Sequence, residues 1–339
     1  MPLLSVDELT VTFTGRGRRD VTAVSGVSFS VDQGQVVGLV GESGCGKSVT
    51  SLALMGLLPR QGVRTGGRAD FDGQDLLRMS NSALRDLRGK QLAMIFQDPL
   101  SSLNPVVPIG LQVTEILTRH RGLRGQAARK EAAHLLDRVG IPDPTRRLKE
   151  YPHQLSGGMR QRALIAMAVA CAPRLLIADE PTTALDVTIQ AQILELLKEL
   201  VDQEGTALLM ITHDLGVVAG LCDEVNVLYA GKVVEAAGRR PLFAAPAHPY
   251  AHGLLGSIPR LDAPRGEPLT PIRGSINDTI AWRDGCAFAP RCDFYTLECL
   301  QGTIELTEPH QPGHQVRCVH PVPPAKAPGH HVLEKEDGA

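Results

Sequence analysis

The segment GESGCGKS has the residue types and the spacing of a loop that binds phosphate groups. Its glycines let the backbone turn so tightly that several N–H groups point at one anion. The lysine can reach the β- and γ-phosphates of a nucleotide, and the following serine hydroxyl can ligate Mg²⁺. A glycine turn with an unrelated lysine is the alternative, and the apolar strand before the segment and the helix after it argue against that alternative. We expect a nucleoside triphosphate and Mg²⁺ to bind at Gly41, Glu42, Ser43, Gly44, Cys45, Gly46, Lys47 and Ser48.

Two adjacent carboxylates, Asp179 and Glu180, follow the apolar run LLIA. Hydrolysis at a phosphate loop requires a further metal ligand and a base, and this pair offers one of each. We expect Asp179 to hold Mg²⁺, directly or through water, and Glu180 to polarise the attacking water. The alternative is a solvated strand end without a catalytic role, which the phosphate loop in the same chain makes less attractive.

A second anion site is indicated by Ser156, Gly157 and Gly158, which precede a basic and apolar helical segment. The N–H groups at the start of a helix attract anions, and the helix dipole adds to this attraction. The alternative is a helix that Ser156 caps without any ligand. The chain therefore has two predicted phosphate sites, although one nucleotide does not need both.

Four of the seven cysteines lie close together near the C-terminus, at Cys286, Cys292, Cys299 and Cys318. The gaps between them are five, six and eighteen residues, which differs from the paired C-x₂-C spacing of zinc ribbons. Four thiolates on irregular loops suit a [4Fe–4S] cluster, with zinc as the second choice and free or disulfide-linked thiols as the third. For His248 and His252 we expect packing instead of metal binding, because the neighbouring sequence offers no carboxylate or cysteine.

The composition is typical of a soluble globular protein, with 43% apolar and 21% charged residues. A net charge of −2 lacks the basic surface of a dedicated nucleic-acid binder, so no direct nucleic-acid partner is expected. No apolar run approaches the ~18 residues of a membrane span, and the acidic N-terminal segment with Asp7 and Glu8 does not resemble a secretion signal. We expect the chain to stay in the cytosol, where reducing conditions favour metal binding over disulfides.

The elements that must position these residues alternate between buried strands and helices. Short, continuous apolar runs predict strands buried on both faces at 35–41, 91–97, 174–180 and 206–214. Helical character predicts helices at 47–58, 125–140 and 188–205. Alternation of apolar and polar residues predicts antiparallel strands at 3–13 and 23–31, and two further antiparallel pairs are expected at 67–77 and 224–237. The pattern predicts an α/β fold with a parallel sheet and an antiparallel β subdomain.

Prolines and glycines become frequent after residue 240, and the periodicity fades. We therefore place an ATPase-type domain at 1–240, with a helical subdomain at 98–165. A small, irregular domain that contains the four cysteines is expected at 241–325. The remaining residues, 326–339, are predicted to form a disordered tail in which His330 and His331 are solvated.

The motifs and their order resemble those of the ATPase subunits of ABC transporters, over roughly residues 3–237. The order is GESGCGKS, then IFQDPLSSLNP, LSGGMRQR, LLIADEPTTALD and LLMITHD. The resemblance implies that Gln97 contacts the metal ion and the water, that His213 senses the γ-phosphate, and that Asp186 crosses a dimer interface. It also implies an aromatic residue against adenine, for which Phe13 is the candidate, with an ordinary place in the strand core as the alternative.

The resemblance also accounts for the second anion site. In ABC ATPases two subunits pack head to tail, and each ATP lies between the phosphate loop of one subunit and the signature helix of the other. Ser156, Gly157 and Gly158 match that signature. The resemblance therefore implies a dimer with two composite sites.

Further phrases are similar to the ATPase subunits of oligopeptide and dipeptide importers, a group that includes nickel importers. These phrases are Met159 within LSGGMRQR, DPLSSLNP, ADEPTTALDVTIQ, and HPYAHGLLGSIPR at 248–260. The resemblance implies ATP-driven uptake of peptides, or of nickel as the alternative. It implies a second ATPase subunit in a heterodimer, two membrane permeases, an extracytoplasmic binding protein, and a place on the cytoplasmic face of the membrane. Some members carry a [4Fe–4S] cluster.

Two other function classes are less well supported. A soluble ABC protein that acts on nucleic acid or the ribosome usually has two cassettes or a coiled-coil insertion, and this chain has one phosphate loop and no heptad run. A regulatory subunit without catalysis would not need the intact set of Lys47, Asp179, Glu180 and His213.

Overall fold

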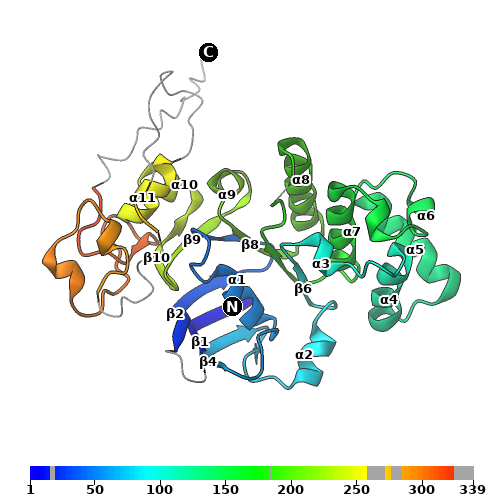
Figure 1. The fold of residues 1–339 in the computed structure, drawn as a ribbon, viewed down its shortest axis with the longest axis horizontal. Helices are drawn as coiled ribbons and strands as arrows, with labels where there is room; N and C mark the ends of the chain where they lie inside the picture. The colour runs from blue at the N-terminus through cyan, green and yellow to red at the C-terminus, as the bar shows by residue number, and fades with distance from the viewer. Residues whose placement is uncertain (16–19, 184, 258–271, 276–284, 324–339) are drawn as a thin grey trace, which may run out of the picture.

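The computed structural model describes residues 1–15, 20–183, 185–257, 272–275 and 285–323. Two sheets and a set of helices give these residues a mixed α/β architecture (Figure 1). The predicted tail at 326–339, with His330 and His331, lies outside the described residues. Within the described ranges, no helix combines the length and the hydropathy of a membrane-spanning segment.

A sheet of seven strands forms the centre of the molecule, in the order β11-β10-β9-β3-β8-β7-β6. The strands β6, β7, β8, β3 and β9 run parallel, whereas β10 and β11 run antiparallel to their neighbours. Their bounds are β3 Val36–Val40, β6 Leu92–Ile95, β7 Leu175–Asp179, β8 Ala207–Thr212, β9 Glu224–Tyr229, β10 Lys232–Gly238 and β11 Gln315–Val316. Every residue of β3, β7 and β8 is buried, which explains their unbroken apolar sequences. The carboxyl ends of these parallel strands lie along one edge, where the functional loops follow.

A second sheet is antiparallel, in the order β2-β1-β4-β5. It consists of β1 Leu4–Phe13, β2 Val21–Val31, β4 Val63–Phe71 and β5 Gln74–Asp75. It lies beside the first helix, α1, and away from the helical part of the molecule (Figure 1). Its inner face carries fully buried residues such as Leu4, Leu9 and Val11, and an irregularity between Val6 and Leu9 shifts the alternation of β1 by one residue.

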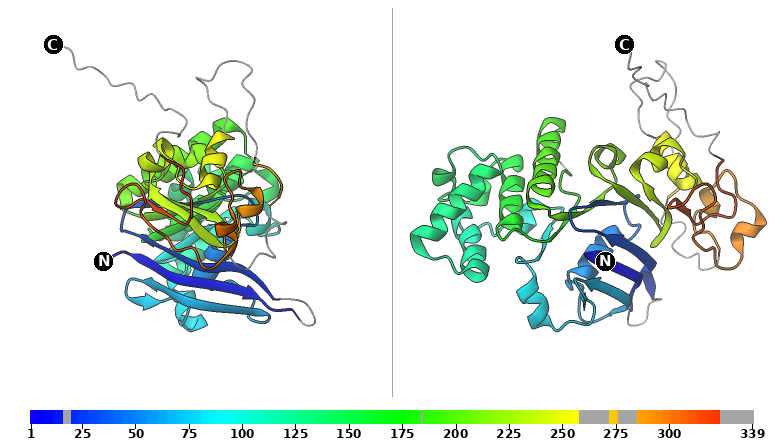
Figure 2. Two further views of the ribbon diagram at one scale, coloured as in Figure 1. Left: turned by 90° about the vertical axis from the view of Figure 1, so that its left-hand side faces the viewer. Right: turned by 180° about the vertical axis from the view of Figure 1, so that it is seen from behind.

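The helices cover the central sheet and extend beyond both of its ends (Figures 1 and 2). The helices between β5 and β7 are α2 Asn81–Leu87, α3 Pro99–Ser102, α4 Ile109–Arg121, α5 Gly125–Arg138, α6 Pro144–Arg147, η1 Pro152–Gln154 and α7 Gly157–Val169. Helices α3 to α6 lie beyond the β6 edge. The turn after α5 closes with Gly140 at φ 71° and a hydrogen bond from the Ile141 N–H to the Leu136 carbonyl at 2.9 Å. Gly140, the last residue of the helix predicted at 125–140, therefore serves as a glycine C-cap.

Helix α1, Lys47–Leu54, is shorter than predicted. The sequence favoured continuation to residue 58, just before Pro59. Gly56 instead adopts φ 57°, and the Leu57 N–H donates to the Leu52 carbonyl at 2.8 Å. This hydrogen bond belongs to the glycine-based motif that ends helices, so an internal glycine ends α1 before the proline is reached.

The C-terminal region lies at the opposite edge of the sheet, next to β10 (Figures 1 and 2). In the described residues, the helices after β7 are α8 Val187–Glu204, α9 Leu215–Leu221, α10 Arg239–Ala244, α11 Pro249–Gly256, η3 Ala289–Arg291 and η4 Leu297–Leu300. Buried Glu235 of β10 accepts hydrogen bonds from the Ala247 N–H at 2.9 Å, the His248 N–H at 2.7 Å and His314 Nε2 at 2.7 Å. Strand β11 and this carboxylate therefore fasten the C-terminal region to the core, and a domain boundary near 240 stays a prediction.

Candidate functional site

The phosphate loop connects β3 to α1 and requires glycine at two crowded positions. Gly41 has φ 154°, and a Cβ atom there would lie 2.3 Å from the Leu228 carbonyl oxygen. Gly46 has φ 104°, and a Cβ atom there would lie 2.4 Å from the Ala23 carbonyl oxygen. Since neither position has room or a suitable conformation for a side chain, the loop can follow its tight path only with glycine. That path directs backbone N–H groups of the loop and of the first turn of α1 toward one point.

Lys47 adds a positive charge at the same place. Its side chain is 5% exposed, and its Nζ donates to the carbonyl oxygens of Gly41 at 2.6 Å and Glu42 at 3.1 Å. The ammonium group is thus fixed over the loop by the loop itself. A triphosphate bound here would meet the lysine charge together with the positive end of α1.

Ser48 and Asp179 place two oxygen ligands side by side. Ser48 Oγ donates to Asp179 Oδ1 at 3.0 Å, and Ser51 Oγ donates to Asp179 Oδ2 at 3.4 Å. Burial raises the pKa of Asp179, and the charge of Glu180 raises it further, against the opposing serine hydrogen bonds and the charge of Lys47. A hydroxyl next to a buried carboxylate fits a Mg²⁺ ion that also contacts phosphate oxygens.

Glu180 is held by three side chains that come from different parts of the sequence. Its Oε2 accepts hydrogen bonds from Gln97 Nε2 at 2.7 Å and Thr183 Oγ1 at 2.9 Å, and its Oε1 lies 3.2 Å from His213 Nδ1. The structure brings together Glu180, Gln97 and His213, which are three of the site candidates named from the sequence, and adds Thr183, which sequence reasoning missed. Gln97 donates through Nε2 in this contact, and a role of its amide oxygen as a Mg²⁺ ligand stays a prediction.

The electrostatics of Glu180 keep its carboxyl group ionised. Burial acts to raise its pKa, but hydrogen bonds from His213 and Thr183 and the charges of His213 and Lys47 outweigh burial, so its pKa is lowered. The carboxyl group is consequently ionised at neutral pH and can accept a proton from water. Its backbone has φ 46°, a left-handed conformation that is unusual for glutamate and is common among strained functional residues.

The signature residues form a second group, at the surface. Ser156 caps α7, and its Oγ accepts a hydrogen bond from the Met159 N–H at 3.3 Å. Asp186 caps α8 in the same way, with Oδ1 accepting from the Ile189 N–H at 2.9 Å. The two helix starts are neighbours, because a Cβ atom on Gly158 would lie 2.9 Å from Ile189 Cγ2. Ser156 and its neighbour Gly157 are exposed, so this anion-attracting surface faces outward.

In a comparison with known proteins, two family models match two different parts of the chain. Residues 24–183 match a family model described as ABC transporter, and residues 234–299 match one described as oligopeptide/dipeptide transporter, C-terminal region. The dipeptide transport ATP-binding protein DppD of Bacillus subtilis is 54% identical over 298 residues, which cover 88% of each chain. This chain belongs to the ATP-binding proteins of oligopeptide and dipeptide ABC transporters.

Further comparisons agree with this assignment. The oligopeptide transport ATP-binding protein OppD of Salmonella typhimurium is 50% identical over 321 residues, or 94% of each chain. Among solved structures, the ATP-binding cassette MJ0796, a dimer in a post-hydrolysis state bound to ADP and Pi, superposes with a TM-score of 0.63 and 28% identity. That superposition covers 70% of this chain and 99% of the cassette. The predicted family, the ABC-type α/β fold and the ATPase activity are therefore confirmed.

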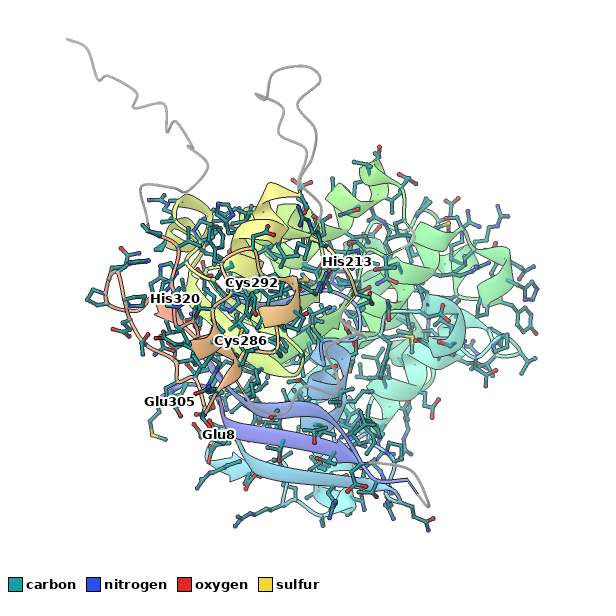
Figure 3. The ribbon with its side chains drawn as sticks, turned by 60° about the vertical axis from the view of Figure 1, so that its left-hand side comes forward. Glu8, His213, Cys286, Cys292, Glu305 and His320 are labelled. Carbon is teal, nitrogen blue, oxygen red and sulfur yellow. The ribbon has the colours of Figure 1, made fainter. Side chains whose placement is uncertain are left out.

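The four C-terminal cysteines of this ABC ATPase line one cavity. Cys286, Cys292, Cys299 and Cys318 surround it together with His248, Phe288 and His320. Figure 3 shows Cys286, Cys292 and His320 gathered in this region. Burial, with an added effect of the neighbouring thiols, raises the pKa of Cys292 to about 11 and that of Cys318 to about 12. The described residues contain no group of three or more His, Cys, Asp or Glu side chains arranged to hold a metal ion, so the metal stays a prediction.

His248 has a richer environment than its neighbouring sequence suggests. From the neighbouring sequence we expected no carboxylate or cysteine near His248, and this was wrong for the folded chain. Glu235 accepts a hydrogen bond from the His248 N–H, and the His248 side chain lines the cysteine cavity. Its packing role agrees with the prediction. The side chain is 1% exposed, and Nδ1 accepts a hydrogen bond from the Tyr250 N–H at 3.0 Å at the start of α11. Burial lowers the pKa of His248 to about 3, so the ring is neutral.

The structure leaves one predicted role open and reveals two residues that sequence reasoning missed. Phe13 ends β1, is half-buried, and pairs with Val21 and Val63, so a place against adenine stays a prediction. Tyr250 and Arg291, in contrast, come from the C-terminal region and contact Glu42 of the phosphate loop. The sequence signals for them are weak: Tyr250 lies within the phrase HPYAHGLLGSIPR, and Arg291 directly precedes Cys292.

Proposed function

We propose that this chain is the motor subunit of an importer of dipeptides and oligopeptides. The observation that supports the motor most strongly is the Glu180 carboxylate, which follows Asp179 at the end of β7 and is held there by Gln97, Thr183 and His213. The relatives described above are named for dipeptide and oligopeptide transport, which favours peptides over nickel as the cargo.

The chemistry of one site follows from these contacts. Lys47 and the loop N–H groups bind the β- and γ-phosphates, while Ser48 and Asp179 hold Mg²⁺, which neutralises charge on the phosphate oxygens. Glu180 accepts the proton of the attacking water. Gln97 lies between β6 and the helical segment and donates to Glu180, so occupancy of the site changes a contact that continues into α3. Coupling between the nucleotide-bound and the nucleotide-free state requires a contact that differs between the two states, and the Gln97 contact is the one that we propose.

We propose a head-to-tail dimer in which Ser156, Gly157 and Gly158 cover the nucleotide of the partner. Two observations support this arrangement. Ser156 and Gly157 are exposed, and a Cβ atom on Gly157 would meet only Leu185, at an ordinary 4.0 Å, so nothing in the described chain requires glycine there. The related cassette MJ0796 was solved as a dimer with ADP and Pi. A second, related ATPase subunit is the partner that we propose.

The remaining partners follow from the transport function. We propose that two permease subunits contact the helical segment at 98–165, that a binding protein delivers the peptide from outside, and that the chain sits on the cytoplasmic face of the membrane. In the described residues, the helical segment lies at the end of the sheet opposite to the C-terminal region, so it is accessible to such partners (Figure 2).

We further propose a [4Fe–4S] cluster at Cys286, Cys292, Cys299 and Cys318. The donor set fits, because four thiols line one cavity. When bound, the cluster would staple loops that have little core of their own. Anaerobic purification with iron and sulfide assays tests this proposal, and equimolar zinc without sulfide would refute it.

The transport proposal is tested by reconstitution of the chain with its partner subunits in proteoliposomes. ATP-dependent uptake of radiolabelled di- and oligopeptides is expected, and Ni²⁺ serves as the competing cargo. Glu180→Gln should abolish uptake while the complex still assembles. Uptake of Ni²⁺ without peptide uptake would overturn the peptide assignment, and ATP-independent uptake would overturn the motor assignment.

A further inference from the structure

The phosphate loop of this protein contains an acidic residue, which is an electrostatic problem for a triphosphate site. Glu42 is the one acidic residue among residues 41–48, and its backbone carbonyl already binds Lys47 Nζ at 3.1 Å. A carboxylate so close to bound phosphates repels them unless another charge compensates it. The side chain of Glu42 is 31% exposed, so solvent alone screens it only in part.

The compensating charge comes from the far end of the chain. Arg291 binds both oxygens of Glu42, with Nη1 to Oε2 at 2.6 Å and Nη2 to Oε1 at 3.0 Å. Its side chain is 3% exposed and lies over the ring of Tyr229 at 5.7 Å. This paired, bidentate geometry is the strongest form of a hydrogen-bonded ion pair. It also orients the carboxylate toward the C-terminal region.

The same guanidinium group shapes one wall of the nucleotide cleft. Arg291 donates to the carbonyl oxygens of Arg273 at 2.6 Å and Gly274 at 3.3 Å. An open cleft of about 450 Å³ lies above the loop, and its lining combines the loop and His213 with C-terminal residues, namely Gly41, Glu42, Ser43, His213, Leu254, Gly274 and Ser275. Tyr250 adds a third link, because its hydroxyl accepts a hydrogen bond from the Glu42 N–H at 2.8 Å.

We propose that Arg291 is a positioning residue for ATP, which neutralises Glu42 and so makes the C-terminal region part of the nucleotide site of its own chain. Arg291 directly precedes Cys292, which lines the cysteine cavity. The proposal rests on ATP binding at residues 41–48. It does not depend on the cargo or on the cluster, because its readout is nucleotide affinity.

A double-mutant cycle separates neutralisation from a purely structural contact. In the full chain assembled with its partners, Mg-ATP affinity is measured by titration, along with KM, kcat and the melting temperature. Arg291→Gln leaves Glu42 uncompensated, and we expect the Kd for ATP to rise about 10- to 100-fold with little change in kcat at saturating ATP. Glu42→Gln added to Arg291→Gln removes the repelling charge, and we expect Kd to return to within about threefold of wild type.

A matched control is Arg273→Gln, which deletes a cation from the same region. The Arg273 side chain is 85% exposed and pairs only weakly with Asp293, at 3.8 Å, so its removal should leave the Kd for ATP unchanged. If Arg291→Gln does not fold, the ATP affinity of the double variant tests the proposal by itself. The double variant should fold, because neutralising both members of a buried ion pair is tolerated far better than removing one. A wild-type Kd in Arg291→Gln, or a double variant that binds ATP more than about tenfold weaker than wild type, would overturn the proposal.

Discussion

Replacement of Glu180 by glutamine removes one negative charge and leaves the shape of the side chain unchanged. The wild-type Oε2 accepts from Gln97 and Thr183, and the new amide oxygen can accept from both. The new amide nitrogen then faces His213 Nδ1, which lies 3.2 Å from Oε1, and can donate to it when the imidazole carries its proton on Nε2. Since every contact has a replacement, we expect the free energy of unfolding to change by no more than about 1 kcal/mol.

The expected effect on turnover is much larger. A positioned general base contributes about 10²- to 10⁴-fold to a rate, which corresponds to about 2.7–5.4 kcal/mol of activation free energy. The substrate phosphates keep the loop, Lys47, Ser48 and Asp179, so the Kd for ATP should stay the same or fall slightly because a negative charge near them is lost. Catalysis and binding are therefore expected to separate cleanly in Glu180→Gln.

Steady-state ATPase rates of the assembled complex, with Kd from equilibrium titration, measure the two effects. Glu195→Gln is the control, because Glu195 is exposed on α8 and its neutralisation should alter neither quantity. A kcat for Glu180→Gln within about threefold of wild type would refute the assignment of Glu180 as the base. A rise in Kd as large as the fall in kcat would show instead that Glu180 holds the nucleotide.

Three further predictions follow from individual contacts. Gly157→Ala should leave the melting temperature unchanged or raise it, because a helical alanine fits that position without strain. The same variant should lower the ATPase rate at least about tenfold, because the added methyl group would obstruct the partner's phosphate, and a normal rate would contradict the composite site. Because burial raises the pKa of Asp179, protons should compete with Mg²⁺, so the Mg²⁺ concentration needed for half-maximal ATPase should increase as pH falls towards that raised pKa; a pH-independent Mg²⁺ titration would argue against Asp179 as a ligand. Tyr250→Phe leaves the Glu42 N–H without its acceptor and should lower the free energy of unfolding by about 1–3 kcal/mol in urea titrations, whereas an unchanged value would mean that water replaces the hydroxyl.

The parts of this site that the sequence predicts are those set by local backbone geometry. The phosphate loop, the acid pair and the signature each combine a few neighbouring residues with one strand end or helix start, so a short segment contains the whole physical requirement. Thr183 lies within such a segment, but its bond to Glu180 depends on a side-chain orientation that residue types do not specify. The end of α1 at Leu54 was missed for a similar reason, because Gly56 and Pro59 both signal a helix end and the sequence does not rank them.

The contacts that the sequence could not predict join segments far apart in the chain. Arg291 and Glu42 are separated by 249 positions, and Tyr250 and Glu42 by 208, so no periodicity connects them. Both depend on the C-terminal region folding back along β10, which β11 and the buried Glu235 enforce. His248 was misjudged for the same reason, since its neighbours in space are distant in sequence.

The two anion sites of one chain differ in how complete they are. At the first, Lys47 is fixed by the loop and Glu180 is already held by three side chains, so the catalytic groups need little rearrangement before ATP binds. At the second, Ser156 and Gly157 cap a helix whose start faces outward. Under the dimer proposal, the step left to complete a working site would be closure of the partner's signature helix onto the γ-phosphate. The permeases could sense this step, because the signature helix and the segment that would contact them belong to the same helical part of the chain.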